Sequence, residues 1–270
     1  MSASAKDVRP AALIAAMALG GTAYGFAATM VIPAVPAIQR SLDVSPTAAG
    51  WALSAYLIAA SVLTGIVGRL GDVFGRRRVL VGALVAAALG SAVCAATDLL
   101  PVLLVGRVIQ GAGGGVYPLA YAILRERLEP GRRESALGLM AATMGLGGGF
   151  GPVLGGLVSD HASYRWIFVV VGVMALAAAA LVVRVVPLVA PPAGGRARID
   201  VLGAVVLAVT VSAPLIAVSQ ANRWGWAAPS TLALFAVGAA MLAVFVALER
   251  RVAEPLVSMR TMALPVVRWT

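Results

Sequence analysis

The 270-residue sequence is poor in charged residues, at 12%, and it contains one cysteine and one histidine. The single cysteine, Cys94, excludes an intramolecular disulfide and any CxxC metal or redox site. Soluble domains carry about 25% charged residues, so a water-soluble single domain is excluded as well. The 11 acidic residues stand at the ends of apolar runs or between them, so no paired carboxylates lie within a run, and the one histidine, His161, lies just past the fifth run. We therefore expect no enzyme, no cofactor and no metal site.

Apolar residues are in excess: they make up 61% of the sequence and form about eight long runs. A hydrocarbon core about 30 Å thick is crossed by a helix of about 20 apolar residues, and uninterrupted runs indicate helices rather than a barrel. The sequence predicts an all-α integral membrane protein with about eight spans, of which the first is too long for a cleaved signal peptide. The expected spans are 11–37, 48–67, 79–97, 101–124, 135–160, 167–187, 201–220 and 230–248.

The formal net charge of +10 raises the question of nucleic-acid binding, but the positions of the basic residues favour another explanation. If the N-terminus is cytoplasmic, 17 of the 21 basic residues fall in cytoplasmic segments, which is the positive-inside bias of helical membrane proteins. We predict a multi-pass protein of the cell membrane, with the lipid bilayer around it, a cytoplasmic N-terminus and no nucleic acid as partner. The basic residues assigned to the cytoplasmic side are Lys6, Arg9, Arg69, Arg76, Arg77, Arg78, Arg125, Arg127, Arg132, Arg133, Arg184, Arg196, Arg198, Arg250, Arg251, Arg260 and Arg268.

The stretch from Gly68 to Arg78, with the sequence GRLGDVFGRRR, separates two apolar runs and predicts a short loop between two spans. The dipole of a helix C-terminus destabilises an acid there by about 0.3–1 kcal/mol. Asp72 should therefore pair with Arg76, with a glycine turn at Gly75. The alternative is a basic loop with an incidental aspartate. The pattern resembles the loop between spans two and three of the major facilitator superfamily, which implies a conformational switch made of Gly68, Asp72, Gly75, Arg76, Arg77 and Arg78.

A second motif lies inside the fourth expected span, where Arg107 interrupts an apolar run at a cost of about 2.5–3.5 kcal/mol near the bilayer centre. On a continuous helix Arg107 shares one face with Gln110 and Tyr121. The alternative is an arginine that snorkels to the nearby membrane surface. The run from Arg107 to Gly114 resembles the fourth-span motif of the same superfamily, and this resemblance implies a part for Arg107 and Gln110 in proton coupling.

The fifth expected span, 135–160, is unusually rich in glycine. Its GxxxGxxxG ridge permits very close contact between helices, and a proline within it adds a bend. Helix packing alone is a sufficient explanation of this composition. The order of the residues also resembles the fifth-span antiporter motif of exporters in the superfamily, which implies efflux. The residues of this motif are Gly147, Gly151, Pro152, Gly155 and Gly156.

The sequence contains a short internal repeat at an offset of 88 residues. The segment GRLGD ending at Asp72 aligns with GLVSD ending at Asp160, and the two fall at opposite ends of spans two and five. Opposite ends and a shared motif are expected of three-helix units repeated with inverted topology. The first three spans and the next three are therefore expected to be equivalent.

The chain is expected to divide at a Pro/Gly-rich basic segment after the sixth span. We predict a six-span transporter half at 1–188, a cytoplasmic linker at 189–200, two extra spans at 201–250 and a cytoplasmic segment at 251–270. The whole chain resembles the amino-terminal portion of the fourteen-span drug:proton antiporter branch of the superfamily. The resemblance implies that a C-terminal half, or a partner chain, is needed for transport.

The function implied by the resemblance is proton-coupled efflux of small amphipathic compounds or drugs by alternating access. The alternative is a truncated, non-transporting fragment or partner subunit. Many members of the branch carry an aspartate in the first span, at the position where this chain has Ala27. Because the other acidic residues lie at span ends or in loops, the sequence shows no buried acid that could carry the proton. Span 79–97 has no ionisable group, so it is expected to offer no site and to serve as scaffold at the outside of the bundle. Residues expected to line the substrate site are Tyr24, Thr29, Tyr56, Gln110, Tyr117, Tyr121 and Met144.

Overall fold

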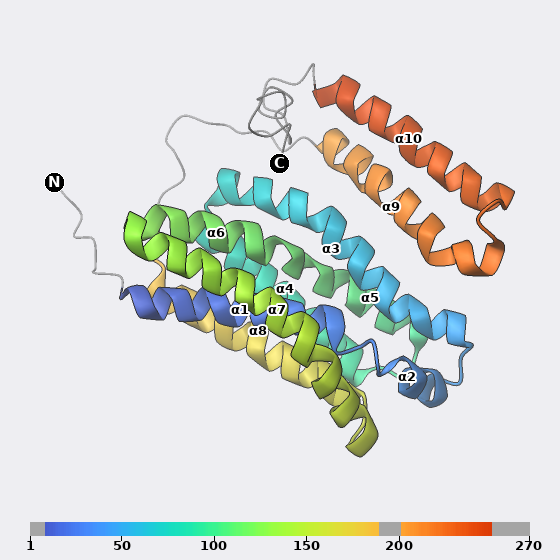
Figure 1. Ribbon diagram of the computed structural model, residues 1–270, viewed down its shortest axis with the longest axis horizontal. Helices are drawn as coiled ribbons and strands as arrows, with labels where there is room; N and C mark the ends of the chain where they lie inside the picture. Colours follow the sequence, from blue (N-terminus) through green and yellow to red (C-terminus); the bar gives the residue numbers. More distant parts are fainter. Residues whose placement is uncertain (1–8, 189–200, 250–270) are drawn as a thin grey trace. The chain divides into compact units, whose positions relative to one another are not determined.

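The computed structural model describes residues 9–188 and 201–249, and every element within these ranges is a helix (Figure 1). Within these ranges eight segments are long and apolar enough to cross a membrane, which confirms the expected all-α architecture with about eight spans. The elements are α1 (Pro10–Thr29), α2 (Val35–Leu42), α3 (Pro46–Phe74), α4 (Arg76–Ala96), α5 (Leu100–Gln110), the 3-10 helix η1 (Gly111–Gly115), α6 (Val116–Arg127), α7 (Pro130–His161), α8 (Arg165–Val185), α9 (Val201–Trp224) and α10 (Pro229–Glu249).

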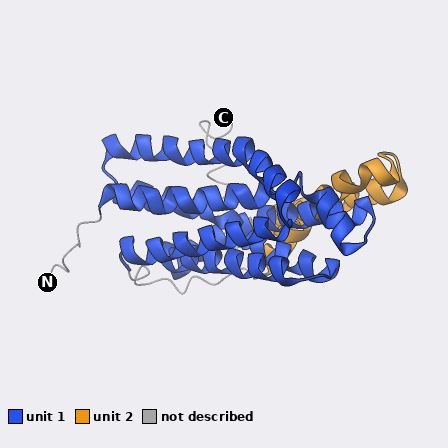
Figure 2. Cartoon of the chain, turned by 90° about the horizontal axis from the view of Figure 1, so that it is seen from below, with its two compact units in different colours: residues 1–191 blue, residues 192–270 orange. Residues whose placement is uncertain are grey.

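The chain forms two compact units, Met1–Pro191 and Pro192–Thr270 (Figure 2). The first unit holds α1 to α8, and the second holds α9 and α10. The predicted linker at 189–200 and the predicted segment at 251–270 lie outside the described residues.

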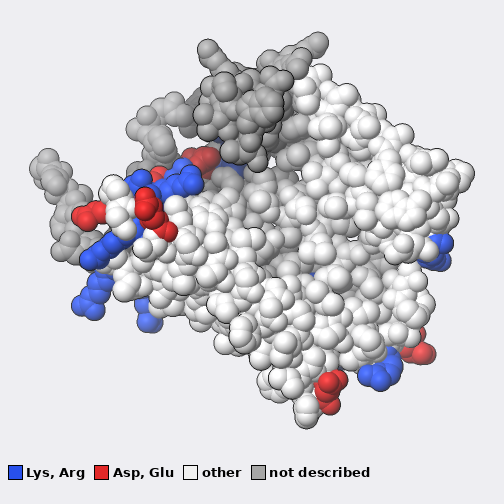
Figure 3. Space-filling view, in the orientation of Figure 1, with Lys and Arg blue, Asp and Glu red and all other residues white. Residues whose placement is uncertain are grey.

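The first unit is a bundle in which α1 packs between α7 and α8, α4 packs along α8, and α3 packs against α5 and η1. Its apolar core has two main clusters, one at each end of the bundle. Charged side chains gather at the bundle ends (Figure 3). We call the end with the α3–α4 turn the basic end. Large core residues are Leu13, Met17, Leu80, Leu84, Leu119 and Ile123 in the first cluster, and Met30, Ile38, Tyr56, Leu103 and Phe168 in the second.

The first span is shorter than expected, because α1 ends at Thr29 rather than near Ala37. Pro33 explains this end. Proline has no N–H to donate to the carbonyl four residues back, here that of Thr29, and its ring clashes with that carbonyl. The chain then turns and begins the short helix α2, which has Pro36 in its first turn.

The fourth span is not the continuous helix that the sequence predicts. It consists of α5, the five-residue 3-10 helix η1 and α6. A Cβ at Gly111 would lie 2.6 Å from Cβ of Ala59, and one at Gly114 would overlap the carbonyl oxygen of Ala60. This segment therefore touches the backbone of α3, and close contact without side chains replaces regular α-helical geometry there.

Span 79–97, expected as scaffold at the outside of the bundle, forms α4, which has one exposed face, where Leu89 is 60% exposed, and is packed on its other sides. It packs against α8, α5, η1 and α3. A Cβ at Gly90 of α4 would lie 2.5 Å from both Gln110 N and Gly106 O, so α4 and α5 are in backbone contact. The sequence does not predict this contact between α4 and α5, because α4 is apolar on all sides and has no periodicity that identifies its buried face.

In its described residues, 201–249, the second unit is a helical hairpin of α9 and α10. The turn between them has Gly225 at φ 95°, where a side chain would be strained, and Thr231 Oγ1 donates to Gly225 O at 2.9 Å. Along the hairpin, Gly238 approaches Pro214, a proline inside α9. Small residues thus allow α10 to pass the bulky ring.

Candidate functional site

The predicted switch at the basic end is a helix junction rather than a loop. α3 continues through Asp72 to Phe74, only Gly75 leaves the helical conformation, and Arg76 already begins α4. Gly75 has φ 93°, which a glycine adopts without strain. The glycine turn is therefore confirmed, but the loop at 68–78 is wrong, because one glycine suffices to reverse the chain.

Arg76 joins two acidic groups at this junction. Its Nη2 lies 3.2 Å from Asp72 Oδ1, and its Nη1 contacts Glu126 Oε1 at the end of α6. The Asp72–Arg76 pair confirms the local ion pair expected from their spacing. Glu126 was missed, because 50 residues separate it from Arg76 and no local pattern connects them.

The glycine that packs at this junction is Gly71 rather than Gly68. A Cβ at Gly71 would overlap Leu119 Cδ2 of α6, whereas a Cβ at Gly68 would meet nothing within 4 Å. Gly71 therefore lets α3 and α6 approach, which brings Asp72 near Glu126. Arg77 points elsewhere, and its Nη2 donates to Val183 O of α8 at 2.6 Å.

We expect Asp72→Asn and Glu126→Gln to change the free energy of unfolding by less than about 1 kcal/mol each, because pairs with half-exposed carboxylates contribute little to stability. The side chains are 53% and 54% exposed. If this charge cluster is a switch, both variants should nevertheless lose efflux at native chain length. Thermal unfolding in detergent and vesicle efflux measure the two effects, with Arg132→Gln, an exposed arginine of α7, as the control. Undiminished efflux in both variants would contradict the switch.

Arg107 lies in the interior of the bundle, with 0% of its surface exposed, so it does not snorkel. Its Nε donates to Ala52 O of α3 at 2.6 Å, and its Nη1 donates to Ala27 O of α1 at 3.0 Å and to Gln110 Oε1. The guanidinium lies 4.3 Å from the centre of the Tyr56 ring, in cation–π contact. Arg107 therefore joins α1 and α3 to α5.

The contact with Ala27 completes the end of α1. Ala27 is among the last four residues of that helix, whose carbonyls have no partner within it. A positive charge there also suits the helix dipole. Arg107 Nη2 has no hydrogen-bond partner among the described residues. The backbone carbonyl of Ala27 thus accepts a hydrogen bond from Arg107, at the position where the resemblance implies an aspartate in many members of the branch.

Gln110 extends this network to α4, since its Nε2 donates to Ser91 Oγ at 2.7 Å. Ser91 in turn donates to Ala87 O at 2.8 Å. Both side chains are buried. The third span therefore does contribute a polar partner, contrary to the expectation from its sequence. A single serine in an apolar run is weak evidence, and its importance comes only from facing Gln110.

Four of the predicted lining residues come together as a tyrosine cluster. Tyr24 lies 6.1 Å from Tyr56 and 5.5 Å from Tyr117 between ring centres, and Tyr117 lies 6.2 Å from Tyr121. Tyr56 donates to Tyr24 O at 3.1 Å, and Tyr117 donates to Gly21 O at 3.2 Å. The cluster joins α1, α3 and α6.

The space beside this cluster is small. A cavity bordered by Tyr24, Tyr56 and Gln110 measures about 10 Å³, which is about the room that one water needs. Tyr56 and Tyr117 are buried, while Tyr24 and Tyr121 are partly exposed. The cavity therefore has room for about one water molecule and not for a drug-sized compound.

Of the three remaining predicted lining residues, Gln110 borders the cavity beside the tyrosines, whereas Thr29 and Met144 do not belong to the tyrosine cluster. Thr29 Oγ1 donates to Gly147 O at 2.6 Å and to Gly25 O at 2.9 Å, so it joins α1 to α7. Met144 is 56% exposed on α7. The structure thus assigns Thr29 to helix packing and leaves Met144 on an outward surface.

The glycine motif of α7 packs so closely against α1 that no side chain would fit at three of its positions. A Cβ at Gly147 would lie 2.8 Å from Gly25 Cα, one at Gly151 would overlap Thr29 Oγ1, and one at Gly155 would overlap Met30 O. Gly156 makes ordinary contact with Pro33, at 3.9 Å, and Pro152 stands inside the helix. Three glycines at intervals of four residues thus form the α1–α7 contact.

Comparison with protein families identifies a match to the model described as Major Facilitator Superfamily over residues 17–252. An uncharacterized MFS-type transporter of Mycobacterium tuberculosis is 32% identical over 261 residues, which are 96% of this chain and 38% of that protein. The tetracenomycin C resistance and export protein of Streptomyces glaucescens is 30% identical over 252 residues, 92% of this chain and 46% of that protein. The puromycin resistance protein of Streptomyces alboniger is 33% identical over 231 residues, 84% and 45%. The chain spans less than half the length of these relatives.

Solved structures share the fold. The peptide transporter PepTSo matches with a TM-score of 0.62 at 14% identity, over 94% of this chain and 55% of that one. The human organic anion transporter MFSD10 matches with a TM-score of 0.57 at 19% identity, over 79% and 56%. Identities this low support the fold alone. The relatives from Mycobacterium tuberculosis and Streptomyces glaucescens are named for transport and export, in agreement with the expectation that this chain is not an enzyme.

Proposed function

This chain belongs to the Major Facilitator Superfamily, and from that premise we propose that it contributes to proton-coupled efflux of small amphipathic compounds or drugs. The observation that carries the direction of transport is the α1–α7 contact made by Gly147, Gly151 and Gly155. This glycine order resembles the antiporter motif of exporters. Relatives named for resistance and export support the same direction.

We further propose that the basic end faces the cytoplasm, with the N-terminus on that side and the protein in the cell membrane. The support is the distribution of charge, since arginines at the ends of α3, α6 and α8 and at the starts of α4 and α7 all lie at this end. In this proposal the switch around Asp72 and Arg76 lies on the cytoplasmic side.

Alternating access requires two halves that move against each other, with the substrate bound between them. The first unit would supply one half, with partly exposed Tyr24 and Tyr121 at the binding surface. A second half, from the same protein or from a partner chain, would supply the other. Arg107 and Gln110 would hold α1, α3, α4 and α5 together during proton coupling, and another group would carry the proton, since no acidic residue is in contact with them in the described residues.

The test is transport in inside-out vesicles with the protein at its native chain length. We expect a pH gradient to drive accumulation of ethidium, and a trapped pH dye to report proton movement in the opposite direction. Vesicles without the protein are the control. Dye transport without proton movement would contradict antiport, while a folded protein with no transport at all would favour the alternative, a non-transporting partner subunit.

A further inference from the structure

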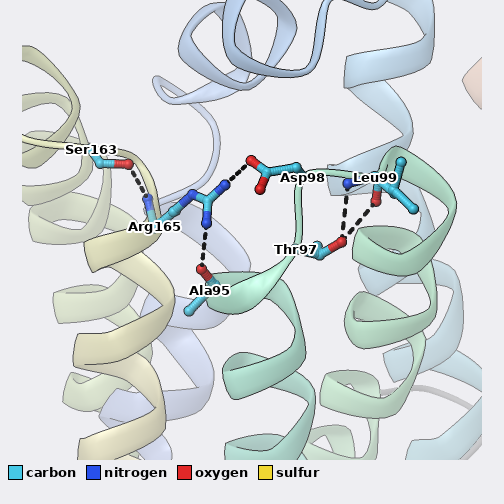
Figure 4. A network of polar contacts seen from close by, with 6 residues as sticks. All are labelled: Ala95, Thr97, Asp98, Leu99, Ser163 and Arg165. Atoms are coloured by element: carbon cyan, nitrogen blue, oxygen red, sulfur yellow. Dashed lines mark hydrogen bonds and ion pairs between the residues drawn. The ribbon is translucent and has the colours of Figure 1, made fainter.

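Two arginines occupy equivalent places at opposite ends of the α4–α8 pair. Arg77, near the start of α4, donates to Val183 O near the end of α8 at 2.6 Å. Arg165, at the start of α8, donates to Ala95 O near the end of α4 at 3.3 Å (Figure 4). The two hydrogen bonds are reciprocal, because each helix provides one arginine and one carbonyl.

The same offset of 88 residues relates the two donor arginines to each other and the two acceptor residues to each other. It separates Arg77 from Arg165 and also Ala95 from Val183, and it is the offset of the GRLGD and GLVSD segments in the sequence. The internal repeat therefore includes two hydrogen bonds as well as the five-residue motif. The partners of one bond are 70 residues apart along the chain, and the partners of the other are 106 residues apart.

The helices keep one register between the two hydrogen bonds. Eleven residues along α4 from Arg77 is Ala88, and eleven residues back along α8 from Val183 is Gly172. A Cβ at Gly172 would lie 3.7 Å from Ala88 O. Seven further residues on each helix lead to Ala95 and Arg165. The helices therefore stay in antiparallel contact from end to end without a slip.

Each arginine satisfies a group that its target helix cannot satisfy. Val183 and Ala95 are among the last four residues of α8 and α4, whose carbonyls have no partner within the helix. A cation at a helix C-terminus is favourable, whereas at the start of its own helix it is not. The placement of Arg77 and Arg165 is thus explained by the partner helix and not by their own.

We propose that Arg77 and Arg165 are positioning residues that tether α4 to α8 at both ends, so that the two helices move as one body. The close contact at Gly172 holds the middle, and each arginine fixes one end. This frame supports Ser91 and, through it, Gln110. The inference concerns only the first unit and does not depend on efflux or on proton coupling.

The test uses this chain in lipid nanodiscs with pairs of spin labels. The buried Cys94 is first replaced by serine. Exposed positions Gly82 and Ala180 then report the basic end, and Ala92 and Val169 report the opposite end. Pulsed electron resonance gives a distance distribution for each pair, and the pair at the far end serves as the internal reference for folding.

We expect Arg77→Ala to widen the distribution at the basic end about twofold, as for a helix end released to fray, and to leave the opposite end unchanged. Arg165→Ala should give the reverse. Arg184→Ala, which removes an exposed charge beside Val183, is the matched control and should change neither. Unchanged widths in both variants, or widening at both ends in either one, would overturn the proposal.

Asp98→Asn separates the two contacts of Arg165, which also pairs with Asp98 Oδ1. The proposal expects unchanged width at the opposite end, because the bond to Ala95 O remains. Widening as large as that of Arg165→Ala would assign the tether to the ion pair and overturn the reciprocal arrangement.

Discussion

Gly155→Ala should lower the free energy of unfolding by about 1–3 kcal/mol and abolish transport at native chain length, because the packed α1–α7 contact has no room for the added methyl group. It would overlap Met30 O, a backbone atom that cannot rotate away. The clash can be relieved only by separating α7 from α1. That separation also weakens the hydrogen bond from Thr29 to Gly147 O.

Gly148→Ala is the matched control for this prediction. Gly148 lies on the same helix, and a Cβ there meets nothing within 4 Å. Alanine is a better helix former than glycine by up to about 1 kcal/mol, so this variant should be as stable as the parent protein or more stable. Thermal unfolding of the variants in one detergent measures the difference. Equal stability of Gly155→Ala and Gly148→Ala would contradict the close α1–α7 contact.

Gly155 and Gly148 show which packing contacts the sequence predicts and which it does not. Composition and the GxxxGxxxG spacing predicted that α7 packs closely on a neighbour, and they selected Gly147, Gly151 and Gly155. They could not identify α1 as that neighbour, because α1 is apolar on all sides and has no distinct face. Nor could they indicate that Gly148 faces outward, since glycine itself carries no polarity.

The charge cluster of Asp72, Arg76 and Glu126 at the basic end shows the same division between local and distant contacts. Asp72 and Arg76 are four residues apart, so helix geometry alone predicts their pairing. Glu126 lies 50 residues from Arg76, and the contact depends on how α3 meets α6 at Gly71. Local spacing therefore gives half of the cluster, and tertiary packing gives the rest.

The sequence predicts a function for Arg107 and places Gln110 beside it, but it does not predict the partners of Arg107 on α1 and α3. An arginine in an apolar run is costly, so the sequence demanded an explanation for Arg107. The explanation lies largely in backbone carbonyls, Ala27 O and Ala52 O, which every residue has and no sequence pattern marks. Carbonyl partners of this kind become visible only when the helices are placed.

Arg107→Ala is therefore expected to act on structure and transport together. It leaves Ala27 O and Gln110 Oε1 without their donor, at about 1–3 kcal/mol for each buried unsatisfied group, and it opens a cavity beside Tyr56. We expect a loss of about 3 kcal/mol or more in the free energy of unfolding. Ethidium efflux should be lost as well.

Arg107→Lys separates charge from geometry at the same place. Lysine keeps the positive charge but lacks the planar fork that reaches α1 and α3 at once. If the fork is what matters, this variant should lose stability by about 1–3 kcal/mol, because one buried carbonyl is left unpaired. Thermal unfolding measures this, with Arg184→Lys, an exposed position, as the control. A fully stable Arg107→Lys with unchanged efflux would show that only the charge is needed, and the role of Arg107 in joining the helices would be wrong.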